Sequence, residues 1–388
     1  MIPYGRQHID DKDIEAVVET LQSDFLTQGP CVPAFEQAIS DRVNSRHAIA
    51  VNSATSALHL ACLALGVGSG DRVWTSPITF VASANCARMC GAEVDFVDID
   101  LETGNMSVSE LASRLESANA RGELPKVIIP VHLCGQPCDM REIHELAQQY
   151  GVRLIEDAAH ALGATYQGEP VGNGRYSDIT VFSFHPVKMI TTGEGGMACT
   201  NHSELAQRMA ELRSHGIVRE PERMAFQADG PWYYEQQALG FNYRMTDLQA
   251  ALGLSQLKRL DDFVERRREL AENYRTALAD LAIQPLVQRE NRESSCHLYV
   301  IRLPWVASLE EKRRCVHLLH SEGVGVQVHY IPLYRQPYYR ECESKMSLRW
   351  MGAEAYYREA ISLPLYPWLN NTEQEHVVDV LHRLASHL

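Results

Sequence analysis

Short apolar runs alternate with helical patterns along residues 48–213, and this alternation constrains the fold more than any other feature of the chain. Strands are expected at 48–52, 72–77, 93–99, 126–133, 152–157, 179–184 and 196–200. Helices are expected near 54–66, 79–91, 107–118, 140–150 and 203–213. Because strands that alternate with helices form parallel sheets covered on both faces, the pattern predicts an α/β fold with a mostly parallel sheet.

The length of 388 residues exceeds what one ordinary hydrophobic core serves, so we expect two domains. A long helix is predicted over 246–277, and the character of the sequence changes after this helix. We therefore predict a large domain over 1–255 and a smaller C-terminal α/β domain over 256–388, with the long helix as the bridge. The smaller domain should contain strands at 297–303 and 324–330 and helices near 308–322, 352–360 and 372–387.

Two other segments have clear local patterns. Residues 10–22 predict an amphipathic helix, because apolar side chains recur at helical spacing. Its apolar face would contain Ile14, Val17, Val18 and Leu21. Residues 217–240 contain Gly230–Pro231 and many polar side chains, which indicates a loop.

The formal net charge of −14 argues against nucleic acid or an anionic membrane as the main partner. The N-terminus lacks a signal-peptide core, and no apolar run is long enough to span a bilayer. Ten cysteines are scattered along the chain without the density of a secreted disulfide scaffold. These features predict a cytoplasmic protein, and they still allow a local basic pocket for a phosphorylated small molecule.

Two cysteine pairs raise the question of a zinc site. Cys86 and Cys90 are four residues apart, as are Cys134 and Cys138, and His132 is close to the second pair. Neither pair has the CxxC spacing of common zinc modules. Small buried hydrophobic side chains are the favoured interpretation, so no metal is expected.

Three segments at the ends of predicted strands could carry chemistry, because open parallel sheets place their sites at the carboxyl ends of strands. The first segment, 52–56, reads Asn-Ser-Ala-Thr-Ser before a predicted helix. A helix N-terminus exposes unpaired N–H groups, and small residues such as Ala54 and Thr55 let a phosphate approach. Ordinary Ser/Thr capping explains the segment equally well.

The second segment contains Asp157 and His160 directly after the strand at 152–157. A carboxylate there can pair with a protonated ring nitrogen, although a helix cap is again an alternative. In the third segment, Lys188 lies just past a buried strand that ends near Ser183, and a glycine-rich turn follows. A lysine among apolar neighbours has a lowered pKa and can form a Schiff base; the alternative is a solvated surface lysine.

Other ligand-binding motifs are missing from the sequence. No GxGxxG follows the first predicted strand, and no GxxxxGK[ST] occurs. Dinucleotide-binding and P-loop interpretations therefore lose their main support.

Together these segments resemble the fold-type-I aminotransferases of the DegT/DnrJ/EryC1/StrS type, which act on nucleotide-linked keto-sugars. The matching pieces cover nearly the whole chain in family order: NSATSALHLACLALG, TSPITFVASAN, EDAAHALGATYQG, FSFHPVKMITTGEGGMACT, LRSHGI, FNYRMTDLQAALGLSQLKRLD and VGVQVHYIPLY. The wording of TSPITFVASAN and LGLSQLKRLD is most similar to the branch of UDP-4-amino-4,6-dideoxy-N-acetyl-β-L-altrosamine transaminases of pseudaminic acid synthesis. The resemblance implies pyridoxal 5′-phosphate as cofactor, a UDP-linked keto-sugar and L-glutamate as substrates, and a homodimer with shared active sites.

The resemblance also implies roles for individual residues. Lys188 matches the lysine that carries the cofactor covalently and moves protons, and Asp157 matches the carboxylate paired with the pyridinium nitrogen. Phe80 matches the aromatic residue that stacks on the cofactor ring, and His160 matches a histidine beside that ring. The pair His185–Pro186 departs from many relatives, and its fixed backbone could alter how the lysine is presented.

The phosphate-binding residues implied by the resemblance are Ala54, Thr55 and Ser183. Asn242 matches a residue that reaches the cofactor phosphate of the neighbouring subunit. His329 and Tyr330 match a segment that lines the sugar pocket.

A basic cluster could bind the diphosphate of the sugar nucleotide, with Arg219 as the leading candidate. Its members are Arg213, His215, Arg219, Arg223 and Arg244. A solvated loop with charges of both signs is an equally good interpretation.

Three alternative functions remain open at this level. A dehydratase of the same fold would use pyridoxamine phosphate, but such relatives carry histidine where this chain has Lys188. A ligand-sensing regulator would need a DNA-binding module, and only residues 1–9 precede the first predicted helix. An aminotransferase for another nucleotide-linked 3- or 4-keto sugar would share all the features above.

Overall fold

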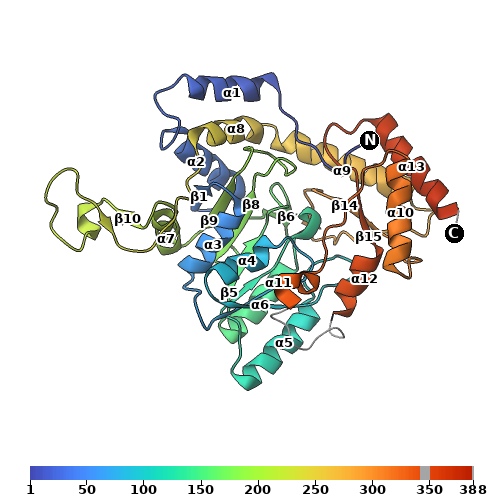
Figure 1. Ribbon diagram of the computed structural model, residues 1–388, viewed down its shortest axis with the longest axis horizontal. Coiled ribbons are helices and arrows are strands. Elements are labelled where there is room, and N and C mark those ends of the chain that lie inside the picture. Colours follow the sequence, from blue (N-terminus) through green and yellow to red (C-terminus); the bar gives the residue numbers. More distant parts are fainter. Residues whose placement is uncertain (341–349, 387–388) are drawn as a thin grey trace.

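A computed structural model describes residues 1–340 and 350–386 of the chain, and a seven-stranded sheet forms its centre (Figure 1). The strand order is β1-β9-β8-β5-β4-β2-β3, and β9 alone runs opposite to the other six strands. The strands are β1 (His47–Val51), β2 (Arg72–Thr75), β3 (Glu93–Phe96), β4 (Val127–Ile129), β5 (Arg153–Asp157), β8 (Ile179–Ser183) and β9 (Gly196–Thr200). The predicted α/β fold with a mostly parallel sheet is confirmed.

Helices cover both faces of this sheet. Successive strand residues point to opposite sides, so a strand that is apolar throughout gives the sheet two apolar faces to bury. On β5, Ile155 packs into the core beneath one set of helices, whereas Leu154 packs into the core on the other side. The helices of the first face are α3 (Ala54–Ala64), α4 (Ala82–Met89) and α7 (Ser203–Arg213). Those of the second are α2 (Cys31–Val43), α5 (Val108–Arg121), α6 (Met140–Tyr150) and α8 (Asp247–Leu257).

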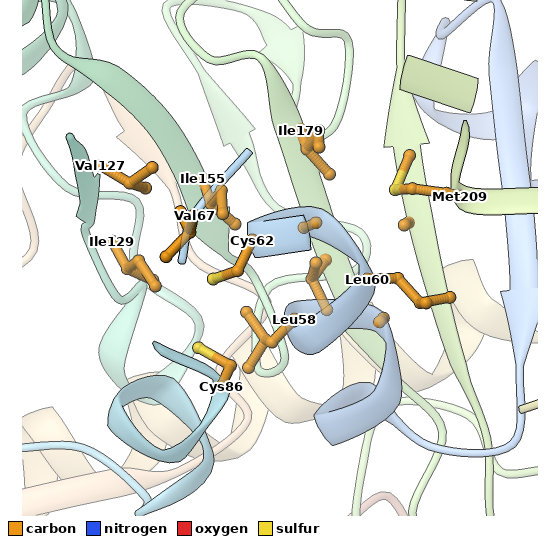
Figure 2. Close-up of a cluster of buried hydrophobic side chains, with 14 of the residues drawn as sticks. Leu58, Leu60, Cys62, Val67, Cys86, Val127, Ile129, Ile155, Ile179 and Met209 are labelled. Atoms are coloured by element: carbon orange, nitrogen blue, oxygen red, sulfur yellow. The ribbon is translucent and has the colours of Figure 1, made fainter. Parts of the chain in front are cut away.

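The core beneath α3 and α4 is the one that supports the cavity described below. Leu58, Leu60 and Cys62 of α3 are buried against Ile155 and Ile179 of the sheet (Figure 2). Burial of aliphatic side chains of this size stabilises the fold by about 1.5–3 kcal/mol each. This packing holds the N-terminal end of α3 at the carboxyl edge of the sheet.

The C-terminal part of the chain builds a second, smaller unit to one side of the large sheet (Figure 1). Its antiparallel sheet has the order β12-β14-β15. Its elements are α9 (Leu260–Ala277), β12 (Gln284–Pro285), β14 (Tyr299–Arg302), α10 (Leu309–Ser321), α12 (Met351–Glu359), β15 (Ala360–Leu363) and α13 (Asn371–Ser386). The short helix α11 (Pro337–Arg340) instead packs on the large unit, where the Tyr339 hydroxyl donates a 2.7 Å hydrogen bond to Asn85 of α4. Ile2 from the N-terminus bridges Val324 and packs against this unit, a contact that the sequence does not signal.

Short elements connect these units. Strands β6 (Thr165–Tyr166), β7 (Glu169–Pro170) and β13 (Arg292–Glu293) form a small sheet of order β13-β6-β7. Single 3₁₀ turns are η1 (Leu133–Gly135), η2 (Pro221–Arg223) and η3 (Leu333–Arg335). Because β13 pairs with β6, residues after α9 return to the large unit.

Three sequence-based expectations differ from the structure. The predicted helix over 246–277 is two helices, α8 and α9, because Arg259 leaves the helical conformation at φ −110° and ψ 7°. Neither glycine nor proline marks this break. Residues 324–330 make only isolated bridges, and the third strand of the small sheet is instead β15. Helix α2 was not predicted.

Helix α1 (Asp11–Leu21) forms where residues 10–22 predict a helix, but its apolar face does not enter the core of the chain. Ile14, Val18 and Leu21 are 54%, 42% and 55% exposed. The side that packs on α8 instead buries Asp13, which pairs with Arg259. We call Ile14, Val18 and Leu21 the exposed face of α1.

The segment predicted as a loop over 217–240 contains a small hairpin of β10 (Ile217–Val218) and β11 (Glu235–Gln236). It extends away from the body of the molecule (Figure 1). Phe226, Trp232 and Leu239 are 75%, 74% and 82% exposed on it. Within the described ranges, the helices are too short or too polar to cross a membrane.

Candidate active site

A cavity of about 630 Å³ opens at the carboxyl edge of the large sheet, where the segments after β1, β2, β5 and β8 meet. This is the place where open α/β sheets bind ligands. It brings together Ala54, Thr55, Phe80, Asp157, His160, Ser183, Lys188, His329 and Tyr330. Nine of the predicted site residues, distant in sequence, therefore line one cavity.

Lys188 lies in a tight turn after β8, where its backbone N–H donates a 2.9 Å hydrogen bond to the carbonyl of His185. Burial of the side chain lowers the pKa of Lys188 to about 8, and the nearby Asp157 carboxylate opposes this shift. A larger share of this amine is thus neutral at pH 7–8 than for a solvated lysine. A neutral amine is a nucleophile and a base.

Asp157 is buried at the end of β5, and its carboxylate accepts two hydrogen bonds. The Ser83 hydroxyl donates at 2.6 Å, and the backbone N–H of Ala159 donates at 3.1 Å. Ser83 itself lies 2.7 Å from the hydroxyl of Thr79. Sequence reasoning did not single out Ser83, although it stands within the TSPITFVASAN segment.

The neighbouring Glu156 points to the opposite side of β5, as strand alternation requires. Its carboxylate contacts the ring Nε2 of His132 at 2.7 Å and accepts a 2.5 Å hydrogen bond from Ser177. The ring Nδ1 of His132 accepts from the backbone N–H of Cys138 at 3.1 Å. Both nitrogens of this histidine are therefore engaged, and across the described residues no group of His, Cys, Asp and Glu is arranged to hold a metal.

The N-terminus of α3 faces the cavity with small side chains. Ser53 caps the helix by accepting a 3.1 Å hydrogen bond from the N–H of Ser56, and Ala54 and Thr55 line the cavity. The positive end of the helix dipole and the first N–H groups favour an anion there. Gly196 of β9 is required behind this turn, since a Cβ would lie 2.5 Å from the N of Ala54.

Aromatic and imidazole rings form another part of the cavity wall. The Nε2 of His160 lies 3.2 Å from the Tyr330 hydroxyl, and the buried Nδ1 has no partner within the described chain. The rings of His160 and His297 stand 4.4 Å apart. His329 contacts the Ser362 hydroxyl through Nδ1 at 2.8 Å.

These histidines are held neutral. Burial lowers the pKa of His160 and His297 well below the usual value, and burial with the nearby Lys188 charge lowers the pKa of His329 to about 4. His297 and Tyr4 also line the cavity, and sequence reasoning missed both. Neither stands in a recognisable ligand-binding motif; His297 only begins the strand predicted over 297–303.

Phe80 presents its ring to the open side of the cavity. The residue is 57% exposed, and its ring centre lies 6.2 Å from that of Tyr330. An exposed aromatic face at the mouth of a polar cavity can stack on a flat ligand.

Other expected residues lie away from this cavity. Asn242 is exposed, and Arg219 is exposed with its guanidinium 5.2 Å from the ring of Tyr234. Arg213 makes an ion pair with Glu36 at 2.5 Å, so its charge is balanced by a carboxylate of the same chain.

The two remaining arginines of the basic cluster are also not part of the cavity lining. Arg223 pairs with Glu211 and Glu220, and Arg244 forms an isolated bridge with Val51. The structure therefore does not bring the predicted basic cluster to the cavity of its own chain.

The donors and acceptors of the cavity fit pyridoxal phosphate. An amine with a lowered pKa, Lys188, suits the aldehyde, and the carboxylate of Asp157 suits a protonated ring nitrogen. The α3 N-terminus suits the phosphate, and the Phe80 ring suits an aromatic face. The unpartnered Nδ1 of His160 leaves a polar atom for the ligand to satisfy.

Comparison with known proteins agrees with this fit. The model of the DegT/DnrJ/EryC1/StrS aminotransferase family matches residues 7–382. The UDP-4-amino-4,6-dideoxy-N-acetyl-β-L-altrosamine transaminase of Campylobacter jejuni is 39% identical over 384 residues, which cover 98% of this chain and 96% of that protein. The spore coat polysaccharide biosynthesis protein SpsC of Bacillus subtilis is 38% identical over 99% of this chain and 97% of that protein.

Solved structures give the same result. Helicobacter pylori PseC, an aminotransferase involved in the biosynthesis of pseudaminic acid, superposes with a TM-score of 0.91 at 32% identity, over 100% of both chains. The PLP form of the sugar aminotransferase Spr1654 of Streptococcus pneumoniae superposes with a TM-score of 0.89 at 31% identity, over 100% of this chain and 99% of that one. The chain therefore belongs to the DegT/DnrJ/EryC1/StrS family and is a pyridoxal-phosphate-dependent sugar aminotransferase.

Proposed function

We propose that this enzyme transfers an amino group from L-glutamate to C4 of a UDP-linked 4-keto-6-deoxy-N-acetylhexosamine in the biosynthesis of pseudaminic acid. The observation that carries the chemistry is that the amine of Lys188, the carboxylate of Asp157 and the N-terminus of α3 share one cavity. The sugar is supported by the activity for which the Campylobacter jejuni relative is named, a UDP-4-amino-4,6-dideoxy-N-acetyl-β-L-altrosamine transaminase that matches nearly the full length of the chain.

Lys188 is the residue that would move protons. When bound, pyridoxal phosphate supplies an electron sink for the charge that develops on the carbon beside the transferred nitrogen. With a pKa of about 8, the Lys188 amine can accept a proton from the amino donor near neutral pH. The same group, now protonated, can deliver a proton to the other side of the transfer and so serves both half-reactions.

Asp157 and the α3 N-terminus would orient the cofactor. Ser83 and the Ala159 N–H hold the Asp157 carboxylate in place as a hydrogen-bond acceptor, so that it can also accept a hydrogen bond from a ring nitrogen. Thr55 and Ser183 supply hydroxyls near the helix N-terminus for the phosphate. His329 and Tyr330 line the remaining wall, where the sugar would bind.

We further propose that the enzyme acts as a homodimer with shared active sites. The exposed face of α1 and the apolar side chains of the 217–240 hairpin are surfaces of the kind that partner subunits cover. Asn242 and Arg219 are exposed and outside the cavity, so a role for either at an active site requires the cavity of a second copy. The scattered, free cysteines of the described chain support a cytoplasmic location.

Two experiments test the proposed function. A panel of UDP- and dTDP-linked 3- and 4-keto sugars, each with L-glutamate, should give the fastest release of 2-oxoglutarate with the UDP-linked 4-keto-6-deoxy-N-acetylhexosamine. Faster turnover of a different keto-sugar would reject the assigned substrate and favour the alternative sugar aminotransferase. Borohydride should fix the cofactor to Lys188, whereas a dehydratase of this fold would not retain it.

A regulatory function is a separate alternative. A gel-shift assay with DNA should show no binding by the purified protein, because its net charge of −14 disfavours a polyanion. A specific shift at physiological salt would instead support a ligand-sensing regulator.

A further inference from the structure

We propose that Cys62 and Cys90 form an oxidation site, at which a hydroperoxide oxidises Cys90 and Cys62 then closes a disulfide between α3 and the end of α4. This site lies outside the cavity described above. It concerns residues to which no role in the transfer reaction has been assigned.

Three thiols meet between these helices. Cys62 lies on α3, Cys86 lies on α4, and Cys90 directly follows α4. The thiol of Cys62 lies next to both other thiols: Cys62 and Cys86 are neighbours in the core beneath α3 (Figure 2), and Cys90 packs against the same core. Thiols that pack side by side can be joined with less movement of the backbone than a disulfide between distant residues would require.

The three thiols differ in access to solvent. Cys62 and Cys86 are fully buried at 0% exposure, whereas Cys90 is partly exposed. The thiol of Cys86 also donates a 3.3 Å hydrogen bond to the carbonyl of Ser83, which directs it along α4. Cys90 is therefore the thiol that a small oxidant reaches first, and Cys62 is the buried thiol beside it.

The surroundings of Cys90 favour its thiolate. Its pKa is lowered to about 6 by the hydrogen bond from Cys62 and by His59, against the opposing effect of burial. His59 lies on α3 one turn before Cys62, and its Nδ1 contacts the Tyr243 hydroxyl at 3.2 Å. Burial instead raises the pKa of the thiol of Cys134. The thiolate is the reactive form, so Cys90 should react ahead of buried cysteines.

The chemistry balances with a hydroperoxide as the only added reagent. The Cys90 sulfur attacks one peroxide oxygen, the O–O bond breaks, and a sulfenic acid and one molecule of water (or alcohol) result. The Cys62 sulfur then attacks the sulfenic sulfur, which forms the S–S bond and releases a second water. Each disulfide thus reduces one hydroperoxide and removes the two thiol hydrogens.

The position of this site connects it to the cofactor cavity. The N-terminal end of α3 carries Ala54 and Thr55, and α4 carries Ser83, which holds Asp157. A bond between the far ends of the same two helices would restrict how the two walls of the cavity adjust to each other. We expect the oxidised enzyme to hold pyridoxal phosphate less tightly than the reduced enzyme.

The test treats the holoenzyme with increasing hydrogen peroxide and maps its peptides by mass spectrometry. The expected product joins the peptide of Cys62 to the peptide of Cys90, is fully reversed by dithiothreitol, and appears before any other cysteine is modified. A bridge that involves Cys86 instead, or prior oxidation of another cysteine, would overturn the proposal.

Cysteine-to-serine variants test which thiol is oxidised first and which one closes the disulfide. Cys90→Ser should abolish the bridge, and Cys62→Ser should leave a sulfenic acid on Cys90 that dimedone labels. Cys31→Ser, which removes another partly exposed thiol, should leave the bridge intact. Circular dichroism of each variant shows that it folds. Loss of the bridge in Cys31→Ser, or no dimedone label in folded Cys62→Ser, would contradict the assignment.

The effect of the disulfide on the cofactor cavity is measured through the affinity for pyridoxal phosphate. The dissociation constant of pyridoxal phosphate should rise severalfold on oxidation of the wild-type enzyme and should not change on the same treatment of Cys90→Ser. Equal cofactor affinity before and after complete bridging would reject the coupling.

Discussion

The carboxylate of Asp157 accepts a 2.6 Å hydrogen bond from the hydroxyl of Ser83, a residue 74 positions earlier in the chain. Ser83 lies on α4 and Asp157 ends β5, so this contact joins a covering helix to the carboxyl edge of the sheet. The bond orients the carboxylate toward the cavity that contains Lys188. It makes Ser83 a positioning residue for the group that would hold the cofactor ring.

Ser83→Ala should weaken cofactor binding and turnover while the fold persists. Hydrogen bonds to charged groups contribute about 1.5–3 kcal/mol, so the dissociation constant of pyridoxal phosphate should rise roughly tenfold or more. Absorbance titration of the apoenzyme measures this change. Ser113→Ala, which removes an exposed hydroxyl on α5, is the matched control and should bind the cofactor normally. Unchanged affinity in Ser83→Ala would refute the positioning role.

The pKa of Lys188 predicts the pH dependence of cofactor capture by the apoenzyme. The neutral amine is the reactive form, and burial lowers its pKa to about 8, so the rate of capture should rise with pH and reach half its maximum near pH 8. A solvated lysine would reach that point near 10.5. Stopped-flow absorbance gives the profile. Lys188→Ala should abolish covalent capture, whereas Lys126→Ala should retain it; capture by Lys188→Ala would assign the link to another amine.

Tyr330→Phe removes the hydroxyl that lies 3.2 Å from the Nε2 of His160. His160 would then lack partners at both ring nitrogens, because its Nδ1 has none in the described chain. A neutral hydrogen bond contributes about 0.5–1.5 kcal/mol, so kcat/KM should fall roughly twofold to tenfold. Steady-state kinetics with both substrates measures it. Tyr150→Phe at the end of α6 is the control, and an equal loss in both variants would show that the effect is not local.

Asp13→Ala should lower the free energy of unfolding of the chain. The buried carboxylate accepts from Gln256 at 2.6 Å and pairs with Arg259, so its loss leaves polar groups unsatisfied in the contact between α1 and α8. Because Arg259 keeps a 2.9 Å pair with Asp10, we expect a loss of about 2 kcal/mol rather than the larger cost of an isolated buried charge. Urea denaturation measures it, with the exposed Asp11→Ala as control.

The pair of Asp13 with Arg259 also predicts how the stability of the fold depends on pH. Burial raises the pKa of Asp13, but hydrogen bonds from Ser255, the Asp10 backbone, Gln256 and Arg259 outweigh it and lower the pKa below 3.8. The carboxylate therefore stabilises the folded chain above that pH, and its contribution is lost as the pH falls further. The difference in the free energy of unfolding between wild type and Asp13→Ala should shrink in acid; a difference that grows would contradict the assignment.

Arg219→Ala tests the shared active site. If Arg219 reaches the diphosphate in the cavity of a neighbouring subunit, its loss should raise KM for the sugar nucleotide roughly tenfold and leave KM for L-glutamate unchanged. The guanidinium of Arg219 lies over Tyr234 and that of Arg175 lies over Tyr176 in a similar way, so Arg175→Ala is the matched control. No difference in KM between the two variants would remove Arg219 from the substrate site.

The sequence by itself determined the central sheet and the edge at which the cavity lies. It did so through local periodicity and through short segments whose residues suggest a chemical role. Alternating strand and helix patterns predicted the sheet, and the segments that contain Lys188, Asp157 and Ala54 marked the edge at which the cavity lies. This worked because residues that end parallel strands meet at one edge whatever the rest of the chain does. The resemblance to sugar aminotransferases used the same segments.

Only the tertiary structure decided which side chains complete the site and which surfaces stay exposed. His297 and Ser83 join the site through contacts across the fold, and the face of α1 is exposed because the buried Asp13 turns the other side of the helix inward. Helical periodicity shows that a face is apolar but not what covers it. Long-range packing decides that, and in this chain it also separates the basic cluster near Arg219 from the cavity of the same chain.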